Sequence, residues 1–482
     1  MKKGLHILLF AAVWLCMAAG VHFAQEFRFY NIESNDLFLY DWTDICGKLC
    51  RTGGLATLLA SFLTQFMRIP FVGTVTVSCI YMLITYLLYR IMDRRADASA
   101  VSGFCLLPAV FLFLCMENDY YRFQGHLAFL LMMTALYAYV SVRKENLRYL
   151  SGIVLIPLLY HAAGSVAVAF VVSAVVWEMT GAGLKGLKSI VYPAVLAALA
   201  YVYVRYSLVS SVEHALTPFM YYDWPSTYFF PVYAWSMVPL MILAAWILSK
   251  VDMKQSFKKT VVIVGIAFSF FLAVNFYGQV HSRSYYRLIQ EQYWAENGDW
   301  DRIIRTADRR QPTFLISYLN LALAQKGLLV QNYKYYNPQD LTYIMYPTPN
   351  LKTGMTLQST VYSAWDYHAA ARQAAFDANV VTSGNCNPRQ LQVLARTNAA
   401  LGAYEVAEKY ITVLEKTLFY RGVAEELRQS MKESAVLPLT DRHIRYDGLE
   451  GDMRDILEVA ASHPILSQFH QLCKILEKGG EK

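Results

Sequence analysis

Residues 261–276 read Val261-Val-Ile-Val-Gly-Ile-Ala-Phe-Ser-Phe-Phe-Leu-Ala-Val-Asn-Phe276, and the composition of the chain changes where this apolar run ends. Residues 1–276 contain 20 Lys and Arg and 14 Asp and Glu, whereas residues 277–482 contain 23 and 22. Of all 482 residues, 56% are hydrophobic and 16% charged, against about 45–50% and about 25% in soluble proteins. The sequence therefore predicts an all-α protein of two units, a polytopic transmembrane domain over 1–276 and an extracytoplasmic helical domain over 277–482.

Nine apolar stretches approach the roughly 20 residues that a helix needs to cross a bilayer. The fifth and sixth are short and meet at 161–165, so they form either a hairpin of two short helices or one broken helix. A signal peptide is the alternative for the first stretch, but no clean Ala-x-Ala site follows its 19 residues, and we expect an uncleaved span. The stretches cover 5–23, 71–89, 101–116, 127–142, 147–162, 166–177, 190–206, 232–248 and 261–276.

Basic residues between these stretches indicate their orientation, because Lys and Arg are enriched in short inner loops. With the N-terminus inside, 14 Lys and Arg fall in inner loops and six fall outside or near outer helix ends. We therefore expect a multi-pass protein of a bacterial inner (cytoplasmic) membrane, with residues 277–482 in the periplasm.

The first outer loop, 25–70, is too long to be a simple turn. Its pattern predicts amphipathic helices over 36–50 and 55–67, separated by Thr52-Gly53-Gly54. Thirteen residues reach about 20 Å at 1.5 Å each, which is too short to cross a membrane. We expect the second helix to lie flat on the outer leaflet.

Two acidic pairs, Glu33 with Asp36 and Glu117 with Asp119, lie just beyond the outer ends of the first and third stretches. If the pairs meet, they could supply a general base or hold a divalent cation beside a phosphate. They are therefore the candidate catalytic residues. The simpler alternative is that these acids are solvated or cap helices, as Asn35 or Asp36 would.

Three further residues are candidates for binding substrate. Arg122 and His126 follow the second acidic pair, and a guanidinium pairs well with a lipid phosphate. Snorkelling at the interface explains Arg122 without function. His161 lies at shallow membrane depth between two short spans, where a packed histidine at a helical hairpin is the alternative. Aromatic residues crowd 219–230, as an interfacial belt or as a sugar contact.

Residues 277–482 show helical periodicity and a partial internal repeat, and we expect helices over 313–326, 360–375, 389–401, 422–433, 452–462 and 465–478, with a long loop over 331–357. The nearly balanced charge argues against a nucleic-acid partner. No zinc-ligand spacing occurs, so no structural metal is predicted, and a divalent metal stays open only at the acidic pairs. The repeat resembles tetratricopeptide repeats, so we expect an α-solenoid; it comprises Gly298, Trp300, Ile303 and Ala307, then Gly402, Tyr404, Ala407 and Ile411.

Several segments resemble an uncharacterised family of polytopic membrane proteins from Bacteroidota with a C-terminal tetratricopeptide-like region. The resemblance covers most of the chain and implies no established activity. The segments are Gly53-Gly-Leu-Ala56 running into Ala60-Ser-Phe-Leu-Thr-Gln-Phe66, Arg68-Ile-Pro-Phe-Val-Gly73, Tyr318-Leu-Asn-Leu-Ala-Leu-Ala324 and Tyr404-Glu-Val-Ala-Glu-Lys-Tyr410.

The order of features is similar to that of GT-C-type glycosyltransferases, which combine a polytopic domain, a long acidic first outer loop and an outer C-terminal domain. The resemblance implies that Glu33 or Asp36 matches the first acidic site and Glu117 or Asp119 the second. One carboxylate would deprotonate or orient the acceptor while a sugar leaves a polyprenyl phosphate, and Arg122 or a metal would neutralise the phosphate. Glu33-Ser-Asn-Asp36 departs from the Asp-Asp, Asp-Glu or Asp-x-Asp pairs of that class.

Two functions are therefore expected, from different classes. The first is transfer of a sugar from a polyprenyl-phosphate carrier on the outer face. The second is a non-catalytic membrane scaffold whose helical repeats bind a protein partner in envelope assembly. A transporter is disfavoured because the apolar stretches contain few ionisable residues.

Overall fold

The computed structural model describes residues 2–94, 101–223, 230–251, 254–309, 312–336, 352–382 and 386–434, with 465, 467–469, 471, 472 and 475 near the C-terminus. Throughout these residues the regular structure is helical, and an isolated antiparallel bridge pairs Tyr121 with Tyr222. The expected all-α fold is confirmed.

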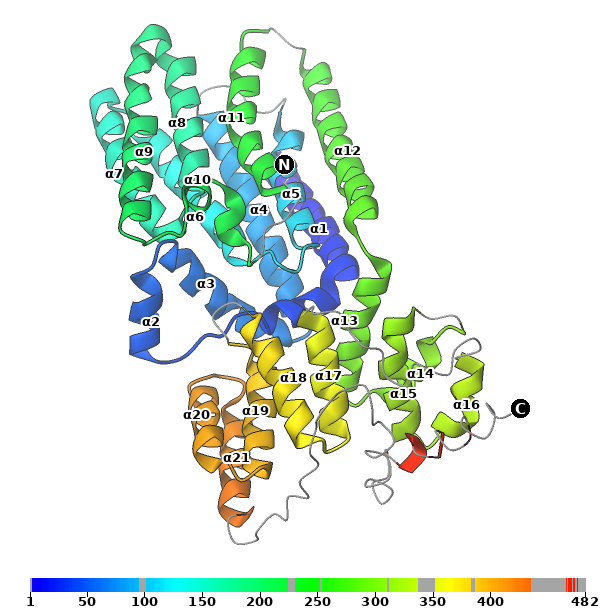
Figure 1. Cartoon of the computed structure of the whole chain (residues 1–482). Coiled ribbons are helices and arrows are strands. Elements are labelled where there is room, and N and C mark those ends of the chain that lie inside the picture. The colour runs from blue at the N-terminus through cyan, green and yellow to red at the C-terminus, as the bar shows by residue number, and fades with distance from the viewer. Residues whose placement is uncertain are drawn as a thin grey trace. The chain divides into compact units, whose positions relative to one another are not determined.

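The chain forms two compact units (Figure 1). The first contains Met1–Glu33 and Tyr40–His281. The second contains Ser282–Lys482 together with six residues from the N-terminal part of the chain, Ser34–Leu39. The composition places the change at 276/277, whereas the structural division falls at His281/Ser282. The inclusion of Ser34–Leu39 in the second unit was not predicted.

Each of the nine apolar stretches is helical over most of its length in the first unit. The helices of this unit are α1 (Lys2–Glu33), α2 (Trp42–Leu49), α3 (Gly54–Thr64), η1 (Gln65–Arg68), α4 (Val72–Asp93), η3 (Ser102–Leu106), α5 (Leu107–Cys115), α6 (Gln124–Ser141), α7 (Glu145–Ala163), α8 (Ala167–Ala182), η4 (Gly183–Ile190), α9 (Val191–Arg205), α10 (Val212–Leu216), η5 (Pro218–Tyr221), α11 (Phe230–Leu248) and α12 (Gln255–Val280).

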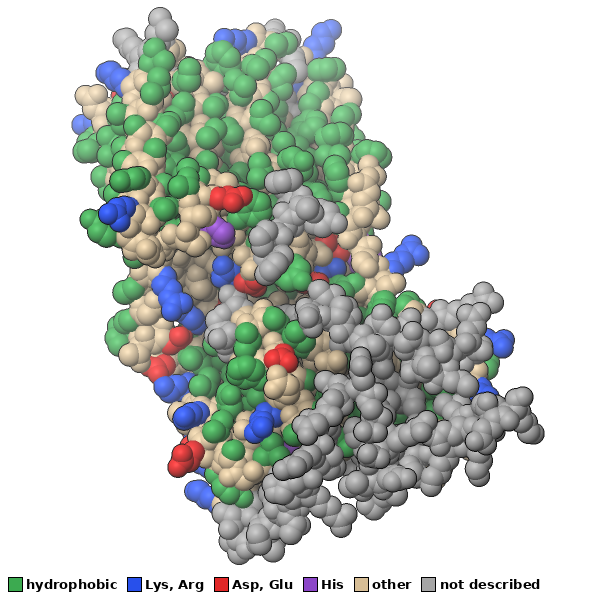
Figure 2. Space-filling model, viewed as in Figure 1, with side chains coloured by type: hydrophobic (Ala, Val, Ile, Leu, Met, Phe, Trp, Pro, Cys, Tyr) green, Lys and Arg blue, Asp and Glu red, His purple; other side chains and the backbone are tan. Residues whose placement is uncertain are grey.

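Four helical segments in the described part of the chain are long and apolar enough to cross a membrane: Val72–Asp93, Gly186–Arg205, Phe230–Leu248 and Gln255–Val280. Hydrophobic side chains cover most of the visible surface of this unit, and Lys and Arg side chains lie at its upper end (Figure 2). On α12, Ile263 is 67% exposed and Phe270 71%. A helix that is apolar all round without being buried in protein is typical of a membrane span.

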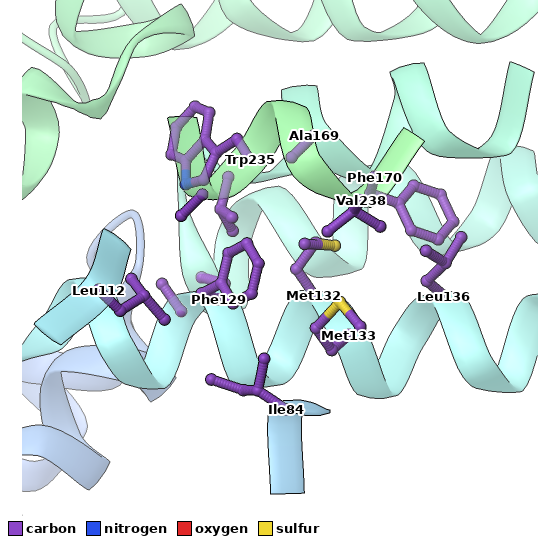
Figure 3. Packing of buried hydrophobic residues seen from close by; sticks show 14 of the residues in the cluster. Ile84, Leu112, Phe129, Met132, Met133, Leu136, Ala169, Phe170, Trp235 and Val238 are labelled. Carbon is purple, nitrogen blue, oxygen red and sulfur yellow. The ribbon is translucent and has the colours of Figure 1, made fainter. Parts of the chain in front are cut away.

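The core of the first unit surrounds α6, which packs against α3, α4, α7 and α8. Met132 and Leu136 of α6 are fully buried. They lie among Ile84 of α4, Phe170 of α8 and Val238 of α11 (Figure 3). Helices from both halves of this unit therefore share one core.

The segment between α1 and α4 forms two helices separated near Gly53, as expected, but the first of them is shorter than predicted. Residues 36–41 are not helical, and α2 begins at Trp42 because Asp41 caps it by accepting a hydrogen bond from the Thr43 amide. The cap is therefore neither Asn35 nor Asp36. Ala56 and Ala60 of α3 are fully buried, and α3 packs against α6 and α7.

The second unit contains α13 (Arg283–Glu296), α14 (Trp300–Thr306), η6 (Thr313–Leu315), α15 (Ile316–Gln325), α16 (Leu329–Tyr336), α17 (Lys352–Ala364), α18 (His368–Val380), α19 (Pro388–Ala400), α20 (Tyr404–Glu415) and α21 (Arg421–Ser434). From α17 to α21, each helix packs against the next. The helix predicted over 360–375 is wrong, because a turn with Asp366 at φ 55° separates α17 from α18. The predicted helix over 452–462, most of the predicted helix over 465–478 and the middle of the loop expected over 331–357 lie outside the described residues.

Candidate functional site: the Arg28 cluster

Helix α1 has 32 residues and continues past the first apolar stretch to Glu33. Its last turns carry Gln25 and Arg28, which are three positions apart and therefore lie on one face of the helix. Gln25 is fully buried and Arg28 is 2% exposed. This helical extension, which the apolar pattern alone does not indicate, brings both side chains to the acidic segment after α5.

Arg28 binds both members of the second acidic pair. Its Nη2 donates to Glu117 Oε2 at 3.0 Å, and its Nη1 donates to Asp119 Oδ1 at 3.1 Å. His281 Nδ1 lies 2.9 Å from Glu117 Oε2, and Gln25 Nε2 lies 3.4 Å from Glu117 Oε1. We call these five residues, Gln25, Arg28, Glu117, Asp119 and His281, the Arg28 cluster.

The cluster joins three segments that are far apart in the sequence. His281 directly follows α12, and its ring stacks on Tyr277 with centroids 4.5 Å apart. The Tyr277 hydroxyl donates to the Ala24 carbonyl at 3.3 Å. The C-terminal end of α12 is thereby fixed beside α1, and His281 is held against Glu117.

Burial differs between the two carboxylates of the cluster. The side chains of Arg28 and Glu117 are 3% and 2% exposed, whereas that of Asp119 is 25% exposed. The attraction within a buried ion pair compensates for the loss of hydration only when the geometry is good and further hydrogen bonds are made. Glu117 meets both conditions, because it contacts Gln25 and His281 in addition to Arg28. Asp119 is the carboxylate of the cluster that a ligand can reach from solvent.

The sequence left open whether a divalent cation lies between the acids. In the structure the cation between Glu117 and Asp119 is the Arg28 guanidinium. In the described part of the chain, no group of three His, Cys, Asp or Glu side chains is placed to hold a metal ion. A small cavity adjoins the cluster; it is lined by Leu114, Cys115, Glu117, Asn118, Tyr222, Phe230 and Val280.

Arg122, a predicted substrate-binding residue that follows Glu117 and Asp119, contacts the segment before α11. Its Nε lies 3.3 Å from Asp223 Oδ1, and its Nη2 donates to the Met220 carbonyl at 3.0 Å. The side chain is 33% exposed. Arg122 is therefore partly exposed to solvent although it is paired with the Asp223 carboxylate.

His126 and His161, the other two predicted substrate-binding residues, lie in different surroundings. His126 is fully buried, and its Nε2 lies 3.0 Å from the Tyr81 hydroxyl. His161 is exposed, with Nε2 3.1 Å from the Leu49 carbonyl oxygen and Nδ1 3.3 Å from the Tyr203 hydroxyl. His126 thus packs inside the helices, whereas His161 links α7 to the end of α2.

The first acidic pair is divided between the two units. Glu33, the last residue of α1, belongs to the first unit and is 2% exposed. Asp36 is half-buried and belongs to the second unit. The expected meeting of this pair with Glu117 and Asp119 stays a prediction.

Sequence reasoning missed Arg28 and His281. One signal was available: an acidic segment that follows an apolar stretch requires a cation if it is buried, and Gln25 and Arg28 share a helix face just after another apolar stretch. No local pattern pointed to His281, which reaches Glu117 only because α12 packs against α5.

A second buried acid, Glu291 of α13, lies in the second unit. Its side chain is fully buried, and Arg287 Nε donates to Oε1 at 2.9 Å. Arg287 Nη2 also donates to the Thr306 carbonyl at 2.7 Å. Burial raises the pKa of Glu291 to about 7, although Arg287 opposes the shift.

This raised pKa predicts a pH dependence of stability. An unfolded glutamate has released its proton above about pH 4.5, whereas the folded chain keeps it up to about pH 7. The contribution of Glu291 protonation to the free energy of unfolding is therefore complete below about pH 4.5. It is lost as the pH rises through about 7, which lowers the free energy of unfolding by roughly 2–3 kcal/mol. We expect Glu291→Gln to become more stable than wild type as the pH rises from 5 to 8, measured as the difference in thermal midpoint of the full chain. Glu405→Gln, at an exposed acid, should show no such trend; equal trends would contradict the assignment.

Comparisons with curated proteins and with solved structures gave no significant match. A family model described as a family of unknown function (DUF6057) matches residues 1–478. The match covers the whole of the first unit and all but the last four residues of the second. The chain therefore belongs to the uncharacterised family DUF6057.

Proposed function

We propose that the chain is a multi-pass protein of a bacterial inner membrane, with its N-terminus in the cytoplasm and its second unit in the periplasm. The apolar helices and the concentration of Lys and Arg in alternate loops support this orientation. We expect alkaline phosphatase fused after Lys482 to be active and green fluorescent protein fused there to be dark. The reverse result would place the second unit in the cytoplasm.

We propose further that the Arg28 cluster is the active site of a glycosyltransferase that uses a polyprenyl-phosphate sugar on the outer face. One observation carries this proposal: three distant segments place a partly exposed carboxylate, a buried carboxylate, a guanidinium and an imidazole together at the ends of apolar helices. Clusters of ionisable groups that burial and mutual contact hold in place are a mark of functional sites. The resemblance to GT-C-type enzymes supplies the reaction class.

Within this proposal, Asp119 is the base. An acceptor hydroxyl gives its proton to Asp119 as its oxygen bonds to the anomeric carbon, while the bond from that carbon to the phosphate oxygen breaks. Polyprenyl phosphate leaves with the bonding electron pair. Arg28 orients Asp119 and Glu117, and Arg122 neutralises the leaving phosphate in place of its contact with Asp223.

The test is turnover with a panel of polyprenyl-phosphate sugars by the full chain in nanodiscs. Asp119→Asn should lose at least about 100-fold in kcat because a general base contributes that much. Glu213→Gln changes an exposed acid of another outer loop and should retain activity. A folded wild type that neither binds nor turns over any donor would overturn the enzyme proposal.

A non-catalytic scaffold is the second candidate function, and one observation favours it. Phe376 and Val380 lie one turn apart on α18, and each is 49% exposed. An apolar strip on a helical unit suits a protein partner in envelope assembly. In cells lacking the native chain, the scaffold proposal expects Asp119→Asn to restore function and Phe376→Glu/Val380→Glu to fail; the enzyme proposal expects the opposite.

A further inference from the structure

Ser34–Leu39 belongs to the second unit, although its neighbours Glu33 and Tyr40 both belong to the first. We call these six residues the strap. The chain leaves the first unit after α1, contributes the strap to the second unit, and returns to form α2. Three peptide bonds therefore join the two units: Glu33–Ser34 and Leu39–Tyr40 at the ends of the strap, and His281–Ser282.

Leu37, Phe38 and Leu39 hold the strap, which has no helical structure from residue 36 onward. Residues 36–41 have no helical structure, and Asp41 has extended backbone angles of φ −132° and ψ 124°. Side chains two positions apart on an extended chain point to the same side. Leu37 and Leu39 both pack against the same hydrophobic cluster, and Leu37 is 6% exposed. Phe38 is 7% exposed, so successive side chains of the strap are covered.

The receiving surface is formed by four successive helices, α18 to α21. Each contributes to one cluster, in which Leu37 is the member that comes from outside the helical array. We call this cluster, without Leu37, the strap site; its buried residues are Ala375, Leu391, Leu394, Ala395, Ile411, Leu414, Tyr420 and Ala424. These eight side chains are at most 4% exposed. Leu37 is therefore buried in the same core as these residues of the second unit.

We propose that the second unit is a peptide-binding unit and that the strap is its resident ligand. The site takes an extended segment that presents two leucines two positions apart, as Leu37 and Leu39 do. Since the strap is tethered, its effective concentration at the site is high, about millimolar for short flexible tethers. A separate peptide of the same sequence therefore competes poorly until the tethered copy is disabled.

The experiment measures binding of a fluorescent peptide, Glu-Ser-Asn-Asp-Leu-Phe-Leu-Tyr-Asp, which copies residues 33–41, to the full chain in nanodiscs. Leu37→Asp in the chain should raise the affinity for the peptide at least about tenfold over wild type, because it vacates the site. Leu49→Asp, at an exposed leucine of α2, should bind the peptide as wild type does. A peptide carrying Asp in place of both leucines should bind neither chain.

A folded Leu37→Asp chain that fails to bind the peptide would overturn the proposal, and so would equal binding by wild type. If Leu37→Asp does not fold, hydrogen–deuterium exchange on wild type decides the question. A millimolar excess of peptide should speed exchange of the strap amides while α18–α21 keep their protection. Unchanged exchange at the strap would show that it is a fixed part of the core and not a ligand.

Discussion

Replacing Arg148 by Met should lower the free energy of unfolding of the first unit by about 3–5 kcal/mol, because Glu178 would then be buried without its cation. Arg148 Nε donates to Glu178 Oε1 at 2.6 Å, and its Nη2 donates to Oε2 at 2.9 Å. The Glu178 side chain is fully buried. The Tyr139 hydroxyl also donates to Oε1, at 2.9 Å, so the carboxylate ties α6 and α7 to α8.

The two partners of this pair should not be equivalent. Arg148 is 15% exposed and lies in the first turn of α7, so without Glu178 its long side chain can reach water. Glu178→Leu should therefore cost less than Arg148→Met, and the double variant should recover most of the stability. Reversible unfolding in mixed micelles measures all three. Glu145→Gln, an exposed acid of the same helix, is the control; equal losses for the two single variants would contradict the argument.

Gly103→Val should also be severe, with an expected cost of about 3 kcal/mol, because α12 approaches η3 closely at this glycine. A Cβ on Gly103 would lie 2.2 Å from the Val262 carbonyl oxygen, which is a backbone atom and cannot swing away. Ser269 Oγ donates to the Gly103 carbonyl at 3.5 Å. Small residues that allow close backbone approach are a typical means of packing helices in membranes.

A matched control exists on α12, the helix that Gly103 approaches. A Cβ on Gly278 would meet nothing within 4 Å, so Gly278→Val changes helix propensity without a clash. We expect Gly103→Val to lower the thermal midpoint in detergent and to raise hydrogen exchange over 262–272, and Gly278→Val to do neither. A similar loss in both variants would show that propensity, and not the close approach, decides the stability.

Hydropathy predicted the all-α class and the approximate positions of the apolar helices. It could do so because a helix long enough to cross a bilayer needs about 20 consecutive apolar residues, a pattern that is visible in the sequence alone. Local pattern failed where tertiary contacts decide. Residues 36–41 have the spacing of an amphipathic helix, yet Leu37 packs on the second unit and Asp41 starts α2 instead. At Asp366 no Gly or Pro marks the turn between α17 and α18.

The candidate site was predictable in part. Charge and position singled out Glu117 and Asp119, but their partners required knowledge of which helices meet. Arg28 lies on α1 and His281 after α12, and neither is near the acids in sequence. The role predicted for His126 rested on its position after the second acidic pair and that for His161 on membrane depth, and neither shows whether a side chain faces protein or solvent.

The strap also has a consequence for the order of synthesis. Leu391 follows Leu37 by 354 positions, and a ribosome needs roughly 20–70 s to add that many residues. Throughout that interval Leu37 has no native surface on which to pack. By the same reasoning, a recombinant fragment beginning at Ser282 would lack Leu37, and the helices α18–α21 would form their core without the contacts that this side chain makes.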